Sequence, residues 1–514
     1  MKSQHTTEHP LWHHPWFVPG MIFLLAFTTH RLVGVPTGFE WDGEAILAGS
    51  TFLEEGNNGL FPIYRYHWQP LSFSFFHLLT EIPGGFALAR LTPGLFGGVA
   101  LALLAFPIRQ LAGGRQCAVL SLMLILLVPE LIYTLLYFNT STLAFPWLTG
   151  SIALAYTTLH DPDRSRRFLL ASAALATIAG FFRADFYLAI PMLTWLIWRH
   201  IGTRSTLAWF VSGVATTLGL GAICGLFDPV QLLVILRLHQ QDFGVGLGPA
   251  QYWSFSQSVE AAFSCLHPLA WLGLLATVTA WGLAGRRDKT AWTIIGPLPF
   301  LLAPLSSLAS PKYALPALVF VPLAFAWGLA RCRLPLTRRL LSISIAIILA
   351  IQVIPLDLRI RPPFVVWNTG PKTSIYTHDG PRSTSGYALA YCRLHSASFV
   401  IGRFVETIVD KIEASTAKHI VIYGNPIPES VLTTGQIFGF LPLTLAERGA
   451  TVTLHRHGYL AIWQDRHILA IATHHPQPPE AIHQLKRHDW LPIYAPDDGF
   501  QIETWRVFAE KLSL

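Results

Sequence analysis

The chain has 514 residues, of which 52% are hydrophobic and only 13% are charged. A soluble globular domain carries about 25% charged residues, so this composition excludes an ordinary soluble protein. The net charge of +7 would suit a nucleic-acid partner, but the basic residues stand in short segments between apolar runs. That pattern is typical of membrane topology, so no nucleic-acid partner is expected.

Apolar segments follow one another from residue 16 to about residue 355, and the hydrophobic excess falls away after that. A helix needs about 20 mostly apolar residues to cross a bilayer. By this measure residues 1–355 form an α-helical polytopic membrane protein of the cytoplasmic (inner) membrane. We expect about eleven transmembrane helices, at residues 16–34, 86–107, 117–136, 143–159, 168–182, 186–199, 206–226, 262–284, 291–309, 314–330 and 338–355.

The orientation of these helices follows from the basic residues of the short connectors. Every connector after an even-numbered span is basic, as the positive-inside rule demands of cytoplasmic loops. The amino terminus is therefore predicted to be cytoplasmic, and the connectors after odd-numbered spans are predicted to face outward. The basic residues are Arg109 and Arg115; Arg164, Arg166 and Arg167; Arg199 and Arg204; Arg286, Arg287 and Lys289; and Arg331, Arg333, Arg338 and Arg339.

Three predicted outward segments are too long to be simple connectors: residues 35–85, 227–260 and 356–514. The last of these has alternating apolar residues and helical periodicity, which together predict a small extracytoplasmic domain of mixed α/β structure. A segment rich in Pro, Gly and Thr, residues 355–382, is its expected linker. We expect strands at residues 418–424, 451–455, 459–464 and 468–473, and helices at residues 399–414 and 435–448.

The first outward segment holds the densest group of acidic residues, Glu40-Trp41-Asp42-Gly43-Glu44. Ionisable residues at membrane depth are costly and therefore suggest a functional site. Asp42 follows the first span closely enough for its carboxylate to face a cavity at the membrane surface. The same acids would also suit a solvated loop face or the start of a short interfacial helix. Basic and aromatic residues follow together at Tyr64-Arg65-Tyr66-His67-Trp68-Gln69-Pro70-Leu71.

Further motifs recur in order along the chain: Ala89-Arg90-Leu91-Thr92-Pro93-Gly94-Leu95-Phe96-Gly97, then Phe182-Arg183-Ala184-Asp185, then Lys312-Tyr313-Ala314-Leu315-Pro316. With the acidic group and the Trp68-Gln69-Pro70-Leu71 segment, they resemble the GT-C class of membrane glycosyltransferases that use polyprenyl-phosphate sugars. The resemblance is nearest to bacterial relatives of protein mannosyltransferases and of the aminoarabinose transferases that modify lipid A. It covers about residues 16–330. The chain departs from that pattern at Trp68, where the family has Lys, and at Asn139-Thr140-Ser141, where an Asp is common.

The resemblance implies transfer of a sugar from a polyprenyl-phosphate donor to a lipid, polysaccharide or protein acceptor outside the cytoplasmic membrane. Such a reaction needs a base for the acceptor hydroxyl and cations for the departing phosphate. Asp42 is the expected base, with Glu44 positioning the base or the acceptor, and transfer in one step would invert the anomeric centre. The expected phosphate ligands are Arg65, His67, Arg183 and Lys312, and the expected supporting residues are Arg90, Asp185 and Tyr313.

Alternative interpretations remain for several of these features. Arg183 and Lys312 could be cations that extend from helix ends to the interface, or Arg183 could form an ion pair with Asp185. A transporter, a flippase or a polymerase of lipid-linked glycans would also have many spans, although transporters usually carry repeats and place charge near the midplane. The residues predict no metal-binding cluster, and they leave open whether a divalent cation takes part.

Overall fold

The computed structural model describes part of the chain, and all statements about structure below concern that part. The described residues are 16–33, 70–80, 82–83, 85–112, 140–160, 165–224, 227, 316, 319–320, 322–323, 326–327, 406, 408–410, 412–416, 418–424, 441–442, 444–455, 458–472, 489–493 and 505–509.

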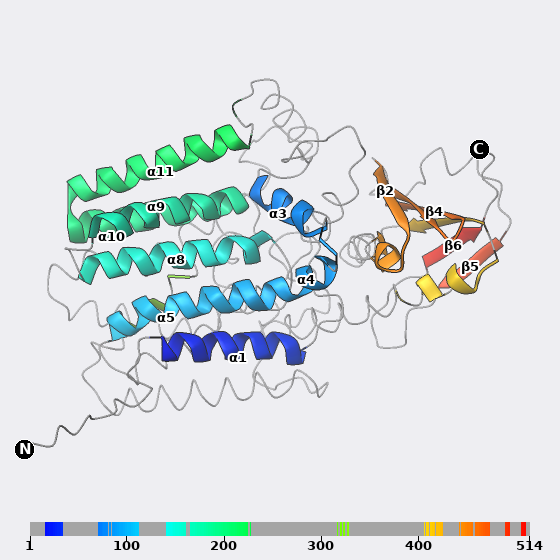
Figure 1. The fold of residues 1–514 in the computed structure, drawn as a ribbon, viewed down its shortest axis with the longest axis horizontal. Coiled ribbons are helices and arrows are strands. Elements are labelled where there is room, and N and C mark those ends of the chain that lie inside the picture. Colours follow the sequence, from blue (N-terminus) through cyan, green and yellow to red (C-terminus); the bar gives the residue numbers. More distant parts are fainter. Residues whose placement is uncertain are drawn as a thin grey trace, which may run out of the picture.

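The N-terminal half of the described chain is helical (Figure 1). The helices lie where six of the predicted spans were placed, those beginning near residues 16, 86, 143, 168, 186 and 206. The spans predicted at residues 117–136, 262–284, 291–309 and 338–355 lie outside the described residues, as does most of 314–330. The α-helices are α1 (Phe17–Val33), α3 (Pro70–Thr80), α4 (Gly85–Thr92), α5 (Gly98–Ala112), α8 (Thr140–His160), α9 (Ser165–Phe182), α10 (Ala189–Ile201) and α11 (Thr203–Ile223).

Two of the predicted spans differ locally from a regular helix. The span predicted at residues 86–107 contains a π-helical turn, η2 (Pro93–Gly97), between α4 and α5. Pro93 has no N–H to donate to the preceding turn, and π-turns occur as insertions within helices. The span predicted at residues 186–199 begins later than expected, because a 3₁₀ segment, η4 (Ala184–Leu188), precedes α10. Two described helical segments are long and apolar enough to cross a membrane, Pro93–Leu111 and Thr203–Ile223.

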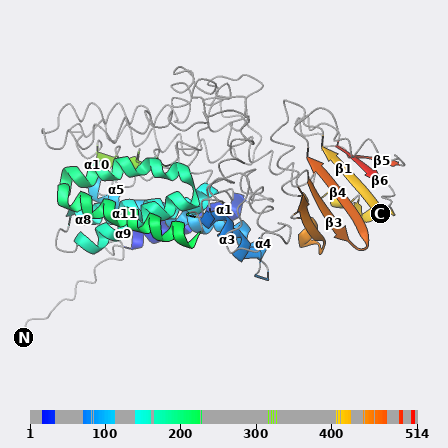
Figure 2. The same ribbon diagram turned by 90° about the horizontal axis from the view of Figure 1, so that it is seen from above.

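Contacts between neighbouring helices fix their directions. Trp16, just before α1, contacts Phe106 of α5 with 5.0 Å between ring centroids, and Phe23, further along α1, lies against Gly98 at the start of α5, so the two helices are antiparallel. Between α8 and α9, Ser151 pairs with Ser172 and Thr140 with Arg183, which also gives an antiparallel pair. Figures 1 and 2 show these helices side by side, with α3 and α4 at one end of the layer.

The basic residues of three predicted cytoplasmic connectors gather at the opposite end of this layer. They lie at the end of α5, the start of α9, the end of α10 and the start of α11 (Figure 1). Three connectors, far apart in sequence, therefore bring positive charge to one end. The residues are Arg109, Arg166, Arg167, Arg199 and Arg204.

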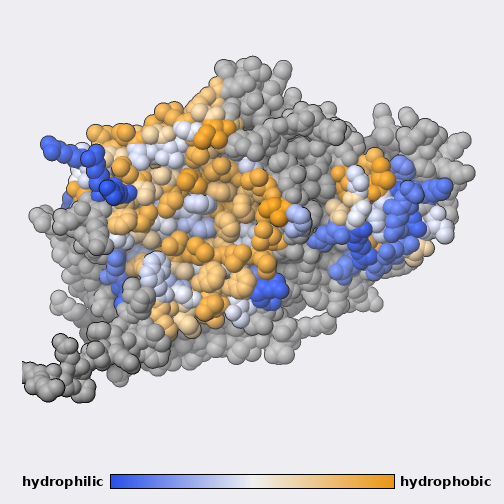
Figure 3. Space-filling view, viewed as in Figure 1, coloured by the Kyte–Doolittle hydropathy of each residue, from blue (hydrophilic) through white to orange (hydrophobic). Residues whose placement is uncertain are grey.

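The face of the helical layer seen in Figure 3 is largely apolar. Helix α11 contributes most clearly, because large hydrophobic side chains along its whole length are exposed and only Trp209 and Gly221 are buried. An exposed apolar surface of this extent is unusual on a soluble monomer and is expected where a helix faces lipid. The exposed side chains of α11 are Leu207, Phe210, Val211, Val214, Leu218 and Ile223.

The described strands all follow residue 418 and form one six-stranded sheet of order β2-β3-β4-β1-β6-β5. Strands β1 and β4 are parallel, with Ile420 opposite Ile468, and the other neighbours are antiparallel. The short turn between β3 and β4 places Gln464 and Asp465 at positive φ, as a tight hairpin requires. The strands are β1 (His419–Gly424), β2 (Thr451–His455), β3 (Gly458–Trp463), β4 (Arg466–Ala472), β5 (Asp489–Ile493) and β6 (Trp505–Ala509).

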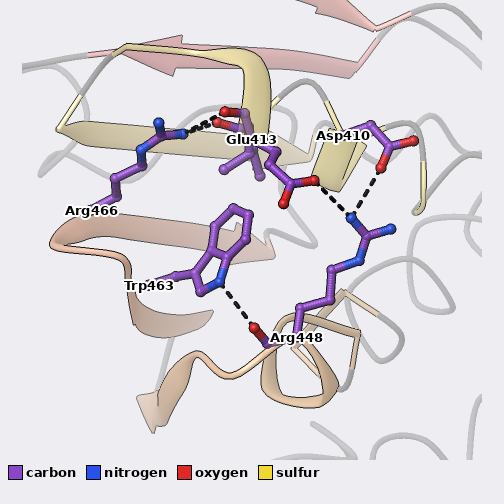
Figure 4. A network of polar contacts seen from close by, with 6 residues as sticks. Asp410, Glu413, Arg448, Trp463 and Arg466 are labelled. Atoms are coloured by element: carbon purple, nitrogen blue, oxygen red, sulfur yellow. Dashed lines mark hydrogen bonds and ion pairs between the residues drawn. The ribbon is translucent and has the colours of Figure 1, made fainter.

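Strands β1 to β4 match the four predicted strands, whereas β5 and β6 were not predicted. The described residues within the two predicted helices of this region, 399–414 and 435–448, are helical apart from Arg448 at the end of the second. Arg448 connects these two segments, because its guanidinium lies 3.0 Å from Asp410 and 3.1 Å from Glu413 (Figure 4). Trp463 of β3 donates to the Arg448 carbonyl at 3.1 Å, which attaches the sheet to the same cluster. The predicted linker, residues 355–382, lies outside the described residues.

Candidate active site

The predicted site residues differ in how far the structure describes them. Asp42, Glu44, Arg65, His67, Lys312 and Tyr313 lie outside the described residues. Arg90 lies in α4, three residues before η2, and Asp185 lies in η4, but the positions of their side chains are not described. Arg183 is described in full, so the geometry of the candidate site is built around it.

Arg183 occupies a break between two helical segments. Its backbone is extended, at φ −156° and ψ 120°, between the end of α9 and the start of η4. The Arg183 N–H still donates to the Ala179 carbonyl at 2.9 Å, and the Arg183 carbonyl accepts from the Phe186 N–H at 3.0 Å. The chain therefore leaves one helical segment and enters the next within a single residue.

A close approach between Gly180 and Tyr187 allows this tight reversal. A Cβ atom at Gly180 would lie only 2.4 Å from the Tyr187 ring, which is closer than side-chain atoms pack. Glycine at this position therefore lets η4 fold back against the last turn of α9. On the α8 side, the ring of Phe182 stacks on that of Trp147, with 5.8 Å between the centroids.

The Arg183 side chain is almost fully buried, with 2% of its surface exposed. Its Nη1 donates to the Thr140 hydroxyl at 3.0 Å, across 43 residues of sequence. Burying a guanidinium removes its hydration, a cost of several kcal/mol that hydrogen bonds and a counter-charge must offset. Arginine stays protonated under all ordinary conditions, so Arg183 places a permanent positive charge at this point.

A second hydrogen bond ties α3 to the same break. The hydroxyl of Ser72, which is fully buried, donates to the Phe182 carbonyl at 2.6 Å. The last carbonyls of an α-helix have no partner within the helix, and a side-chain donor commonly satisfies them. Segments of α3, α8 and α9 therefore meet at Arg183.

On the α8 side, the Thr140 hydroxyl contacts the Arg183 guanidinium. Thr140, Ser141 and Thr142 are consecutive residues of the first turn of α8, and all three are buried. A guanidinium can hold an anionic oxygen, since it offers several donors in a rigid plane. The arrangement therefore suits a phosphate or a carboxylate of a ligand.

Thr140 and Ser72 were not predicted as site residues. Thr140 belongs to the polar run Asn139-Thr140-Ser141 at the start of an apolar span. That run marked a departure from the family pattern, but it did not indicate which residue Thr140 contacts. For Ser72 the only signal was its place just after Pro70-Leu71. Hydrogen bonds across 43 and 110 residues cannot be recognised from local spacing.

A second close approach lies between α1 and the π-helical turn. His30 is buried near the end of α1, and its ring lies against Gly94 of η2, where a Cβ atom would come within 2.6 Å of it. Neither His30 nor the π-helical turn was predicted as part of a site. The described residues hold no group of three or more His, Cys, Asp or Glu side chains placed to bind a metal ion.

The described helices, with their exposed apolar faces and two segments long enough to span a bilayer, have the features of a helical membrane protein. No protein-family model and no curated protein matches the chain.

Two solved structures of ArnT from Cupriavidus metallidurans are similar to it, one in the apo state and one bound to undecaprenyl phosphate. They are 16% and 15% identical to this chain, and each alignment covers 82% of this chain and 76% of ArnT with a TM-score of 0.46. A TM-score below 0.5 does not establish a common fold.

Proposed function

We propose that this chain is a polytopic membrane glycosyltransferase that transfers a sugar from a polyprenyl-phosphate donor to an acceptor outside the cytoplasmic membrane. The observation that carries the proposal is the position of Arg183. Its buried guanidinium lies at the end of α9, whereas the basic connectors lie at the opposite end of the helical layer. Basic connectors are expected on the cytoplasmic side, so Arg183 would lie near the outer face.

A position near the outer face suits an arginine that binds the phosphate of the lipid donor. A polyprenyl phosphate has its headgroup at the membrane surface, where a cation at a helix end can reach it. As the acceptor oxygen attacks C1 of the sugar, the bond between C1 and the phosphate oxygen breaks and negative charge grows on the departing lipid phosphate. A fixed guanidinium stabilises that charge more strongly than the charge of the intact donor, which lowers the barrier.

The remaining roles rest on the sequence motifs. Asp42 takes the proton of the acceptor hydroxyl, and Glu44 positions Asp42 or the acceptor. Arg65, His67 and Lys312 join Arg183 around the donor phosphate, with Arg90, Asp185 and Tyr313 in support. A single displacement inverts the anomeric centre, and residues 356–514 form a domain on the same outer side.

Transfer activity tests this proposal directly. The purified protein would be incubated with a panel of polyprenyl-phosphate sugars, and sugar release or transfer would be scored. We expect turnover with at least one donor, and we expect Asp42→Asn to reduce it by at least about 10²-fold while the protein still inserts and folds. Failure with every donor would favour a transporter, and full activity of Asp42→Asn would remove Asp42 from the role of base.

A further inference from the structure

We propose that the basic end of the helical layer binds anionic phospholipids, with their phosphate groups on arginines and their acyl chains along the exposed face of α11. Figure 3 shows hydrophilic side chains at that end, directly beside the apolar face. The inference does not depend on sugar transfer, because it concerns the end of the layer opposite Arg183. The arginines are Arg109, Arg166, Arg167 and Arg204, which are all exposed.

Positive charge exceeds negative charge at this end. The three connectors, residues 109–115, 161–167 and 199–204, carry seven arginines and two aspartates, and the aspartates lie outside the described residues. Within the described part of the chain, none of the four exposed arginines forms an ion pair with a carboxylate. Like charges gathered at one place repel one another, and the anionic lipids of a cytoplasmic leaflet supply the opposite charge.

Two neighbouring helices carry three of these arginines. Arg166 and Arg167 lie in the first turn of α9, and Arg204 lies in the first turn of α11. The helices are in contact, because the Ser212 hydroxyl of α11 donates to the Leu170 carbonyl of α9 at 3.2 Å. Both helices begin at the same end of the layer (Figure 1). A lipid with two phosphate groups, such as cardiolipin, can therefore contact arginines of both helices.

The turn between α10 and α11 fixes the place of Arg204. Gly202, at φ 101°, is the single residue between the two helices, and this left-handed region favours glycine. Its carbonyl accepts from the Thr206 N–H at 3.1 Å and from the Thr206 hydroxyl at 3.0 Å. Arg204 therefore lies on an ordered helical turn that follows α10 without a loop.

One face of α11 joins a charged position to a row of apolar positions. Side chains three or four residues apart lie on the same face of a helix, so Arg204 shares its face with Leu207, Val211, Val214 and Leu218. All five side chains are exposed. A soluble anion would use only the arginine, whereas the apolar row also suits the acyl chain of a lipid. The combination favours a lipid over a soluble acidic partner.

Binding of cardiolipin to the purified full chain in delipidated detergent solution tests this inference. Native mass spectrometry would count the bound lipids, and a titration followed by thermal shift would give the Kd. We expect saturable binding of cardiolipin, and binding at least about tenfold weaker for phosphatidylethanolamine, which has no net charge. Equal binding of the two lipids would overturn the inference.

Substitutions at the two ends of the layer locate the site. Arg204→Gln should weaken cardiolipin binding about fivefold, and Arg204→Lys, which keeps the charge, should bind within about twofold of the wild type. Arg31→Gln is the matched control, because Arg31 is an exposed arginine in the last turn of α1, at the opposite end. It should bind cardiolipin as the wild type does. Wild-type binding by Arg204→Gln, or an equal loss in Arg31→Gln, would contradict the proposed site. If Arg204→Gln did not fold, the pair Arg167→Gln and Arg167→Lys would replace it.

Competition separates a lipid from other anions. Glycerol phosphate has the phosphate chemistry of the headgroup but no acyl chain, and soluble polyglutamate offers only carboxylates. Neither should displace cardiolipin at equal concentration, because neither contacts the apolar row of α11. Displacement by glycerol phosphate would reduce the site to one for phosphate alone. Displacement by polyglutamate would indicate a soluble acidic partner, and either result would overturn the assignment to a phospholipid.

Discussion

Arg183 shows how one residue can require several others to be small or polar. Its extended backbone ends α9, which leaves the Phe182 carbonyl for Ser72. Its buried charge requires polar partners, one of which is Thr140. The reversal into η4 requires a residue without a side chain one turn earlier, and Gly180 meets that need. Each of these residues is explained by the place of Arg183 at a helix break.

Replacing Gly180 with alanine should disturb this break. The added methyl group would lie 2.4 Å from the Tyr187 ring, so η4 or the end of α9 must move. Overpacking of this kind costs about 1–3 kcal/mol, and we expect a lower melting temperature in detergent and weaker donor binding. Gly219→Ala in α11 is the control, because a Cβ atom there meets nothing within 4 Å. An unchanged melting temperature for Gly180→Ala would show that the tight packing is not required.

At the scale of secondary-structure elements, polar side chains join the helices within the layer. Ser151 of α8 and Ser172 of α9 each donate to the other's carbonyl, at 2.7 and 2.9 Å, and their hydroxyls lie 3.0 Å apart. Trp209 of α11 donates to the same Ser172 hydroxyl at 3.3 Å. One small side chain therefore connects three helices in an otherwise apolar layer, where small residues let helices pack closely.

Ser172→Ala should weaken this connection. It leaves the Ser151 carbonyl and the Trp209 indole N–H without the hydroxyl of Ser172, at a cost of about 1 kcal/mol. Thermal unfolding in detergent, followed by fluorescence, should give a lower midpoint than the wild type. Ser205→Ala, a half-buried serine of α11, is the matched control and should change little. If the two variants unfolded alike, hydrogen bonding between these helices would contribute nothing measurable.

Elements with a strong local pattern could be predicted from the sequence, and those shaped by tertiary contacts could not. The lengths of the apolar runs predicted six of the helices. The alternation of apolar and polar residues predicted strands β1 to β4. Helix α3 has only 11 residues, too few to stand out as a span. Strand β5 contains Pro492, which argues against a strand except at the edge of a sheet, and β5 is an edge strand. Arg183 was recognised from its motif, but its hydrogen bond with Thr140 depends on how α8 packs against α9.

Across the described part of the molecule, clustered basic side chains and exposed apolar side chains occupy different regions of the helical layer. Arg109, Arg166, Arg167, Arg199 and Arg204 lie at one end of the helical layer, and α3, α4, Arg31 and Arg183 lie at the other. In Figures 1 and 2 the six-stranded sheet lies beyond the end with α3 and α4. Between the two ends, the exposed side chains of α11 are apolar along its length. A cluster of basic connectors at one end is typical of the cytoplasmic side of a membrane protein.

Reporter fusions at the two ends of α11 test this orientation. We expect a fusion truncated after Gly202 to give fluorescent green fluorescent protein and inactive alkaline phosphatase. A fusion truncated after Cys224 should give the reverse, because alkaline phosphatase needs the oxidising side to form its disulfides. The two truncations differ only by α11 and the one residue after it, so each controls for the other. Equal signals at both points would mean that α11 does not cross the membrane. Exchanged signals would place Arg183 on the cytoplasmic side, where an enzyme acting on the outer face could not use it.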